Sequence, residues 1–586
     1  MKRKWLTTNI DFAVLFFIGL FSIFIAISLA SFGIEFHHDY FSIISAYLQS
    51  LGLAPHAEAY NHYGIVDSTF KEIILKISGR LVSVKISYVI INVLTCLLIA
   101  FSTKKRSLRF FLGTFSILWF VLDPSLLGIK DFSSFLGTIS PPDSKLTKLA
   151  WPSDLANLFG ALWIFLSIRM YRNLEFTWIL KSRNTIIYGL LSGLLVTLTW
   201  LTKFTLGASF FIAVLVSLAT LCFLSKRGDI FPKIILYFLL GVTGSYLLII
   251  SVYQLLFDGF LSAYVYQTFT VQKDFFGVSG DGGGVGMLVS KYLDILKEKL
   301  FGHQLWWLAA FFLVMAITSR ASVDLGRLKK FALVFVSTIA GFYLYKDYGH
   351  NIKSVDHIVS FVFTLSILIW ILTIERFSNI LTKGRMEASD HSRNELNVFL
   401  VFLTPIAYMS LLQIAPLGDP LHIWWSSLFL FNLVALQCIL FCEQSSLING
   451  SRNILLIGIS VCALTYISLQ LNHSHKELTK LNKSSLEFVR LGKEYGILEG
   501  IRVDSRSEQG SYLTNIVSTN DGLKVIAGPD ALPELLSDPS KYAKWSKCLG
   551  APLNIVRRIS PEKNRYSENL EVCIARNMPQ TSDWRN

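Results

Sequence analysis

Long apolar stretches separated by short polar segments fill the first 470 residues of the chain. A helix that spans a membrane needs about 20 mostly apolar residues. Thirteen stretches approach this length, and we expect each to be a transmembrane helix. They lie, within a few residues at each end, at 12-32, 84-101, 110-123, 154-168, 184-201, 205-225, 234-257, 305-318, 331-345, 358-375, 397-415, 423-442 and 454-470. The first is longer than the apolar core of a signal peptide, so we interpret it as a retained span.

The composition agrees with this pattern. Hydrophobic residues make up 52% of the 586 residues and charged residues 16%, whereas an ordinary globular protein has roughly 25% charged residues. The low counts of 7 Cys and 15 Pro exclude a disulfide-rich scaffold, a collagen and a disordered chain. We therefore expect an all-α polytopic membrane protein.

The distribution of Lys and Arg predicts which way the spans point. Placing the N-terminus in the cytoplasm makes the inner segments roughly three times as dense in these residues as the outer loops, as the positive-inside rule requires. The long outer loops are then 33-83, 124-153 and 258-304, and the C-terminus is extracytoplasmic. The formal charge of +14 is mostly a signal of this topology, so we expect no nucleic-acid partner.

After residue 470 the chain has the polar composition of a soluble domain. Residues 471-586 contain no predicted span, a helical spacing over 476-494, and short apolar runs near 523-527, 553-556 and 570-575 that read as strands. The sequence predicts a domain 1-470 in the membrane and a small α+β domain 471-586 outside it. Cys548 and Cys573 are the two cysteines on the predicted outer side, and whether they form a disulfide stays open.

The first outer loop concentrates groups that can do chemistry. It begins Glu35-Phe36-His37-His38-Asp39-Tyr40, continues through a predicted interfacial helix from Phe41 to Leu53, and reaches Tyr60-Asn61-His62-Tyr63-Gly64. Three interpretations stay open: a bound divalent metal ion, a hydrated interfacial loop, and a catalytic carboxylate with His and Tyr beside it.

Further polar residues on the predicted outer side are suited to binding phosphate. They follow the ninth and eleventh spans and interrupt the fifth and sixth: Lys203, His350, Lys353, Asp356, His357, Asp419 and His422. Several precede an inward-going helix, whose free N-H groups attract anions. Asp356 and Asp419 could equally be helix N-caps, and Lys203 could reach ordinary lipid headgroups instead.

Taken together, these features resemble the GT-C superfamily of integral-membrane glycosyltransferases, which includes protein O-mannosyltransferases and the lipid A aminoarabinose transferases. The resemblance rests on His37-His38-Asp39, on Gly52-Leu53-Ala54-Pro55 with Tyr60 to Gly64, and on Trp200-Leu201-Thr202-Lys203. It covers roughly residues 1-470. Many members have adjacent acidic residues in the first loop, whereas Glu35 and Asp39 are separated by two histidines, which leaves metal use and the identity of the base open.

The resemblance implies transfer of a sugar from a polyprenyl-phosphate donor to a glycan, lipid or protein acceptor at the outer face of the plasma (inner) membrane. It would be an inverting displacement in which a carboxylate acts as the base. Asp39 would be this base, with Glu35, His37 and His38 beside it. Lys203, His350, Lys353 and the neighbouring Asp and His residues would hold the phosphate, and Tyr40, His62 and Tyr63 would support the loop or the acceptor. No cofactor is certain, although a divalent metal ion is compatible with the loop.

Two other functions fit an outer-face site. A polysaccharide polymerase or ligase would use the same lipid-linked substrates, but the 258-304 loop contains no Arg, which such enzymes usually need. A transporter of lipid-linked sugars would show paired halves and polar groups at mid-membrane, and neither is evident. The clustering of polar residues at one face therefore favours a transferase.

Overall fold

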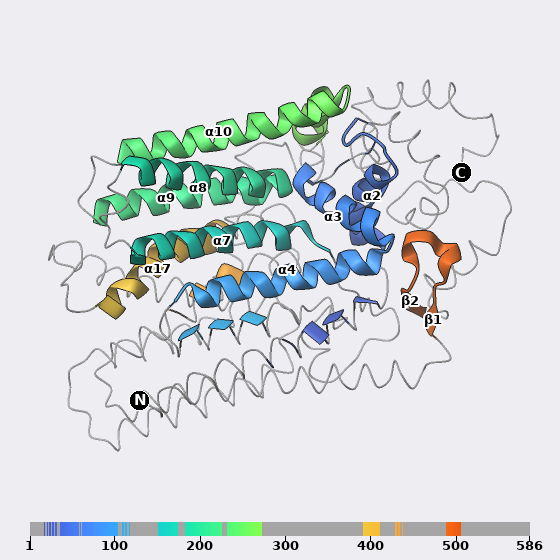
Figure 1. Ribbon diagram of the computed structural model, residues 1–586, viewed down its shortest axis with the longest axis horizontal. Coiled ribbons are helices and arrows are strands. Elements are labelled where there is room, and N and C mark those ends of the chain that lie inside the picture. Colours follow the sequence, from blue (N-terminus) through green and yellow to red (C-terminus); the bar gives the residue numbers. More distant parts are fainter. Residues whose placement is uncertain are drawn as a thin grey trace, which may run out of the picture.

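The computed structural model describes most of residues 36–103, 150–173, 182–224, 231–271, 391–410 and 488–504, with isolated helical positions within 17–31, 108–117 and 428–436. These residues are mostly helical. Figure 1 shows long helices lying side by side, with two shorter helices and a small hairpin gathered at one end of the bundle. A mostly helical architecture is therefore confirmed for this part of the chain.

Three of the described helices are long and apolar enough to cross a membrane. They are α4 (Leu81–Phe101), most of α8 (Ser182–Thr202), and α10 (Phe231–Leu256). They match the predicted spans 84-101, 184-201 and 234-257. Helices α7 (Pro152–Asn173), α9 (Phe204–Leu224) and α17 (His391–Ser410) lie at three further predicted spans. The other seven predicted spans lie largely or wholly outside the described residues.

Helices α8 and α10 touch through their backbones. Gly189 and Gly193 are four residues apart on α8, a spacing that lets neighbouring transmembrane helices approach closely. A Cβ atom on Gly193 would lie 2.5 Å from the Phe238 carbonyl oxygen on α10. The outer side of α10 exposes Leu240, Leu248 and other leucines, as expected of a surface that faces lipid.

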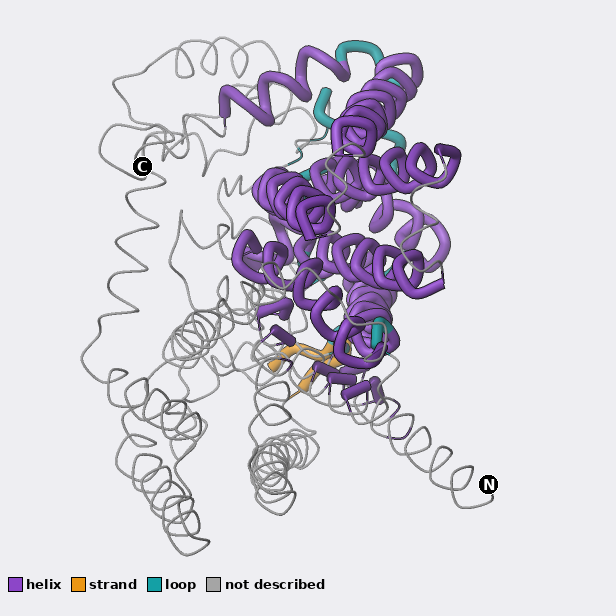
Figure 2. Tube along the Cα trace, turned by 90° about the vertical axis from the view of Figure 1, so that its left-hand side faces the viewer, coloured by secondary structure: helices purple, strands orange, loops and turns teal. Residues whose placement is uncertain are grey.

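Helix α7 lies at the centre of a second set of contacts. The Trp163 indole donates a hydrogen bond to Ser192 Oγ on α8 at 3.0 Å, and its ring meets Phe210 on α9 and Phe402 on α17 edge-on. A buried indole needs such an acceptor for its N–H group. One side chain thus ties together four helices, and Figure 2 shows the described helices packed against one another.

The first outer loop is more helical than the sequence indicates. The predicted interfacial helix exists as α2 (Phe36–Ser50), but it begins five residues before the predicted start and so includes His37 to Tyr40. A second helix, α3 (Ile65–Ser78), was not predicted. Its buried face carries Ile65, Asp67, Ser68, Lys71 and Leu75, and this mixture of charged and apolar residues hides the usual apolar periodicity.

The chain after the predicted spans returns to these first-loop helices. Strands β1 (Phe488–Arg490) and β2 (Arg502–Asp504) pair antiparallel around the 3₁₀ helix η4 (Lys493–Leu498). The predicted helix over 476-494 is therefore wrong at its C-terminal end, where Val489 lies in a strand. The predicted strands beyond residue 504 lie outside the described residues.

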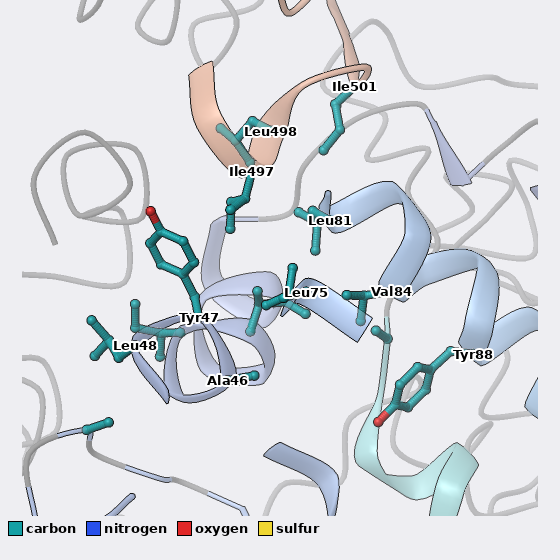
Figure 3. Packing of buried hydrophobic residues seen from close by; sticks show 14 of the residues in the cluster. Ala46, Tyr47, Leu48, Leu75, Leu81, Val84, Tyr88, Ile497, Leu498 and Ile501 are labelled. Carbon is teal, nitrogen blue, oxygen red and sulfur yellow. The ribbon is translucent and has the colours of Figure 1, made fainter. Parts of the chain in front are cut away.

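Apolar residues hold this hairpin in place. Ile497, Leu498 and Ile501 pack with side chains of α2, α3 and α4 in one core cluster, among them Tyr47 and Leu81 (Figure 3). Arg80 adds an ion pair to Glu499 at 2.7 Å. The two segments, far apart in sequence, therefore lie at the same end of the bundle.

Candidate functional site

Lys203 lies at the junction of α8 and α9 and is buried. Its Nζ donates a hydrogen bond to Ser153 Oγ at 2.9 Å and lies 5.6 Å from the centre of the Trp151 indole ring. A cation above an aromatic face is stabilised by the negative potential of the ring. Lys203 therefore points into the protein, with its ammonium group among described helices and not on their outer surface.

Three helices begin close to Lys203. Helix α9 starts at the next residue, and α7 starts at Pro152, beside Ser153. Helix α3 starts after Gly64, whose N–H group donates to the Thr202 carbonyl at 3.1 Å. A Cβ atom on Gly64 would lie 1.8 Å from the Leu201 carbonyl oxygen, so only glycine allows this approach. The convergence gathers the positive ends of three helix dipoles around one lysine.

A buried ion pair lies on α3. Lys71 Nζ is 2.6 Å from Asp67 Oδ2, and the two side chains are 0% and 2% exposed. Lys71 also donates to the Ser42 hydroxyl and carbonyl oxygens on α2, at 2.6 and 3.0 Å. The Tyr88 hydroxyl on α4 donates to the other Asp67 oxygen. These contacts fix α2, α3 and α4 relative to one another.

A second buried carboxylate, Asp154, lies in the first turn of α7. Its Oδ2 accepts a hydrogen bond from the Asn92 amide at 3.2 Å. Asp154 and Asp67 both act electrostatically on Lys203. We call Asp67, Lys71, Asp154 and Lys203 the charge junction. It contains two acids and two bases, all with at most 9% of their surface exposed.

The electrostatics of the charge junction are governed by burial. Desolvation lowers the pKa of Lys203 to about 7, although Asp154 and Asp67 oppose this shift. Desolvation likewise raises the pKa of Asp67, and Lys71, Tyr88 and Lys203 oppose the change. An ionised group out of water is costly unless it is paired. The junction therefore responds strongly to any charge added to it or removed from it.

The structure joins two of the residues that the sequence singled out. The Tyr63 ring meets the Trp151 ring edge-on at 5.4 Å, and the Lys203 ammonium lies 5.6 Å from the centre of the same Trp151 ring. The Tyr63 N–H group also donates to Asn61 Oδ1 at 3.2 Å. The predicted loop-support residue Tyr63 and the predicted phosphate ligand Lys203 thus share one aromatic side chain.

The other predicted site residues have no described side chain. His37, His38, Asp39 and Tyr40 lie in the first half of α2, one turn before Ser42, and only their backbone is described. The remaining ones lie outside the described residues: Glu35, His62, His350, Lys353, Asp356, His357, Asp419 and His422. Within the part of the chain that the structure describes, no three His, Cys, Asp or Glu residues gather as metal ligands.

Asp67, Lys71 and Asp154 are not among the site residues predicted from the sequence. The sequence does contain a signal, because Asp67 and Lys71 are four residues apart, the spacing of an ion pair on a helix. This spacing carries no weight in a segment that is predicted to be a loop. Asp154 begins a predicted span, where a carboxylate reads most simply as a helix cap.

A cavity opens between α7, α8, α9 and α17 below Lys203. Its empty space of about 280 Å³ is partly open to solvent, and it is lined by apolar side chains together with Asn157, Thr199, Ser209 and Ser410. The Thr199 carbonyl accepts the Lys203 N–H group at 2.9 Å, which places the cavity one helical turn from the charge junction. Polar side chains thus continue from the junction into the helix bundle.

Comparison of the chain with protein family models, with curated protein sequences and with solved structures finds no match.

Proposed function

We propose that the protein is a membrane glycosyltransferase that moves a sugar from a polyprenyl-phosphate donor to an acceptor at the outer face of the plasma (inner) membrane. The observation that carries the proposal is Lys203, a buried cation at the end of apolar helices, among three helix N-termini. Ionisable groups inside a membrane protein are costly and usually serve a function. A phosphate at the end of a lipid chain carries the negative charge that would pair with Lys203. It would also lie at the end of the apolar helices, where Lys203 is found.

The proposed chemistry needs a base and a site that stabilises the leaving phosphate. Lys203 supplies a positive charge for the phosphate. Asp39 is the proposed base for the acceptor hydroxyl. On α2 it lies one turn before Ser42, which binds Lys71 of the charge junction. The acceptor oxygen attacks the anomeric carbon, its proton passes to Asp39, and the bond to the phosphate oxygen breaks.

The proposed topology has thirteen spans, a cytoplasmic N-terminus and an extracytoplasmic domain at 471-586. The contact between the 488–504 hairpin and helices α2 to α4 supports it. Because these segments touch, they lie on one side of the membrane, which requires an even number of crossings between them. The sequence predicts twelve.

The proposal is tested by releasing the carrier. Purified protein in lipid nanodiscs is incubated with polyprenyl phosphates carrying different labelled sugars, and free polyprenyl phosphate is measured. We expect release with at least one donor. Asp39→Asn and Lys203→Met should each lower the rate at least about 100-fold, while Lys76→Met, an exposed lysine on α3, should leave it unchanged. No release with any donor would contradict the proposal, and lipid movement without bond cleavage would instead indicate a transporter.

The pH dependence gives a sharper test of Lys203. Its pKa of about 7 means that the free site loses its positive charge as the pH rises through 7. We expect the KM for the donor to increase above pH 7 in the native protein. In Lys203→Arg the increase should disappear, because arginine remains protonated over this range. The same increase in both proteins would remove Lys203 from phosphate binding.

A further inference from the structure

A second buried polar network, built from uncharged side chains, lies beside the charge junction. It links α2, the segment 55–61, α3 and the π-helix η2 (Tyr266–Val271), and consists of Gln49, His56, Asn61, Ser68 and Gln267. We call it the uncharged network. The direction of each hydrogen bond in this network follows from which atoms can donate. Two acceptor atoms then remain without a donor.

The first direction is set at Gln267. Its Nε2 donates to the His56 carbonyl oxygen at 2.7 Å, so its Oε1 faces the other way and accepts the Asn61 N–H group at 3.2 Å. The same Oε1 lies 2.7 Å from His56 Nδ1. Because an amide oxygen only accepts, Nδ1 carries the proton. In the neutral imidazole, Nε2 is then an acceptor.

The second direction is set at Ser68. Its hydroxyl donates to the Ile65 carbonyl oxygen at 3.1 Å, which uses its only proton. It must therefore accept from the Gln49 and Asn61 amide groups, at 3.2 and 2.9 Å. Gln49 consequently turns its Oε1 away from Ser68.

Both acceptors left over are buried. Within the described part of the chain, neither His56 Nε2 nor Gln49 Oε1 has a hydrogen-bond partner, and their side chains are 2% and 3% exposed. Leaving a buried polar atom without a hydrogen bond costs free energy, and such atoms are rare in folded proteins. Both atoms call for the same complement, a group that donates hydrogen bonds.

The backbone around His56 is unusual in two further respects. Among the described residues, His56 is the one non-glycine residue with a positive φ, at 60°. Its partner Gln267 lies in a π-helix, a form found often at functional sites. Strained backbone persists where the surrounding structure enforces it, and it is enriched at binding sites.

The surroundings of His56 favour a neutral ligand over a cation. The imidazole meets the rings of Phe260 and Tyr264 edge-on at 5.6 and 5.1 Å. The hydrogen-bonding neighbours of His56 are amides, and no group of metal ligands surrounds it within the described residues. A hydroxyl group satisfies an imidazole nitrogen in such an environment without bringing a charge.

We propose that the uncharged network is a recognition site for sugar hydroxyl groups, which donate hydrogen bonds to His56 Nε2 and Gln49 Oε1. The identification of the ligand as a sugar rests on the proposed function. Both atoms are buried, so binding of a sugar requires the side chains around them to shift. Gln267 ties His56 to η2 and keeps its imidazole in the accepting tautomer.

The site is tested with variants that remove only the accepting atoms. Asparagine tolerates a positive φ better than most residues, and its amide group can still donate to Gln267. His56→Asn therefore removes Nε2 with little change to the fold, and Gln49→Met removes the second acceptor. The matched control is Gln254→Met, since Gln254 is a surface glutamine that binds only a nearby backbone N–H group in the described structure.

Two measurements are made on the full-length protein. The first is the KM for the donor that gives carrier release, which we expect to rise about 5-fold for each lost hydrogen bond, with kcat changing less. The second is the ¹⁵N signal of His56 Nε2, assigned by its absence in His56→Asn. We expect it to shift toward the hydrogen-bonded position when methyl glucoside, methyl mannoside or methyl arabinoside is added, and not when polyprenyl phosphate without sugar is added.

The outcomes separate this inference from the proposed function. A ¹⁵N shift with a sugar but no carrier release from any donor would keep the site and contradict the transferase. Carrier release with an unmoved ¹⁵N signal and normal KM in both variants would keep the transferase and overturn the site. A signal already at the hydrogen-bonded position, and unchanged by every sugar, would show that water occupies the position and would also overturn it.

Discussion

Where α8 meets α10, two helices approach so closely that glycines are required, and the contact contains no charged pair among the described residues, only backbone, mostly apolar side chains and a hydrogen bond from Thr197 to the Val242 carbonyl oxygen. Where α3 meets α7 and the α8–α9 turn, the contact contains four charged side chains with almost no exposed surface. The first interface is stabilised by close packing, and the second by pairing of charges. The first should be damaged by added atoms and the second by the loss of a partner.

The difference between the two interfaces also indicates which of them has a structural role alone and which is tied to the proposed activity. Close packing of apolar helices is sufficient to hold a membrane protein together. Buried charges add little net stability, because their desolvation offsets most of their attraction. Burying the charges of the charge junction costs desolvation free energy without a matching gain in stability, which points to a function for these residues. The α8–α10 contact needs no functional explanation.

The largest effect should follow from removing one partner of the buried pair. Lys71→Met leaves the Asp67 carboxylate buried without its counter-ion, which costs about 3–5 kcal/mol. We expect a large loss of folded protein, measured by thermal denaturation in detergent. Asp67→Asn together with Lys71→Met should recover most of the loss, because no unpaired charge then remains.

The exposed pair on the same helix provides the control. Lys76 and Glu72 are also four residues apart and 2.6 Å from each other, but the Lys76 side chain is 54% exposed. Lys76→Met should hardly change stability. If the double variant at the buried pair were as unstable as Lys71→Met alone, the loss would come from packing and not from charge.

The pH dependence of stability reports on His56, a buried titratable group whose hydrogen-bonding neighbours are uncharged. Burial lowers the pKa of His56 to about 4, from 6.5 in an exposed imidazole. The unfolded chain therefore binds a proton at a higher pH than the folded chain does. The contribution of His56 to stability is fully present above pH 6.5 and is lost as the pH falls toward 4, up to about 3 kcal/mol.

This contribution is isolated by difference. Native protein and His56→Asn are denatured between pH 7.5 and 4.5, and we expect the difference in their stabilities to shrink as the pH falls. Lys76→Met, at an exposed position of α3, serves as a variant that should keep the native pH dependence. A constant difference between native protein and His56→Asn would mean that the pKa of His56 is the same in the folded and the unfolded chain, against the lowered pKa expected from burial.

The part of the fold that the sequence predicts well is the part built on one strong signal. The spans at 84-101, 184-201 and 234-257 are long apolar runs, and α4, α8 and α10 occupy them within a few residues. Helix α3 lacks that signal, because Asp67 and Lys71 lie on its buried face. A charged residue reads as exposed until its partner is known, and Tyr88 and Ser42 come from other helices.

In the candidate site, too, some residues can be predicted from the sequence and others cannot. Lys203 was identified because a lysine that interrupts two apolar runs stands out in a sequence. Asp154 and Ser153 could not be assigned to it, because their meeting depends on how α7 packs beside the α8–α9 turn. The accepting nitrogen of His56 depends on Gln267, which is distant in the sequence, so the sequence alone does not reveal it.

A smaller effect should follow from adding one methyl group at the α8–α10 contact. In Gly193→Ala the new Cβ would lie 2.5 Å from a carbonyl oxygen of α10, and overpacking of this kind costs about 1–3 kcal/mol. Gly244→Ala is the matched control, because Gly244 is on α10 and has no atom within 4 Å of its Cβ position. Thermal denaturation should show a loss for the first variant and none for the second. Equal stabilities would mean that α8 and α10 separate at no cost.

The smallest effect is expected at the ion pair that joins the hairpin to the first-loop helices. Arg80 Nη2 lies 2.7 Å from Glu499 Oε1, closer than many ion pairs, but the side chains are 48% and 26% exposed. Water screens such a pair, so Arg80→Ala should cost less than about 1 kcal/mol. The apolar contacts of Leu498 and Ile501 should keep the hairpin docked, and Leu498→Ala should therefore cost more. Protease cleavage after Arg490 and Arg502 measures both variants. If Arg80→Ala released the hairpin and Leu498→Ala did not, the hairpin would be held by the exposed ion pair and not by its apolar contacts. Charge pairing would then stabilise the surface of this end of the bundle as well as the buried charge junction.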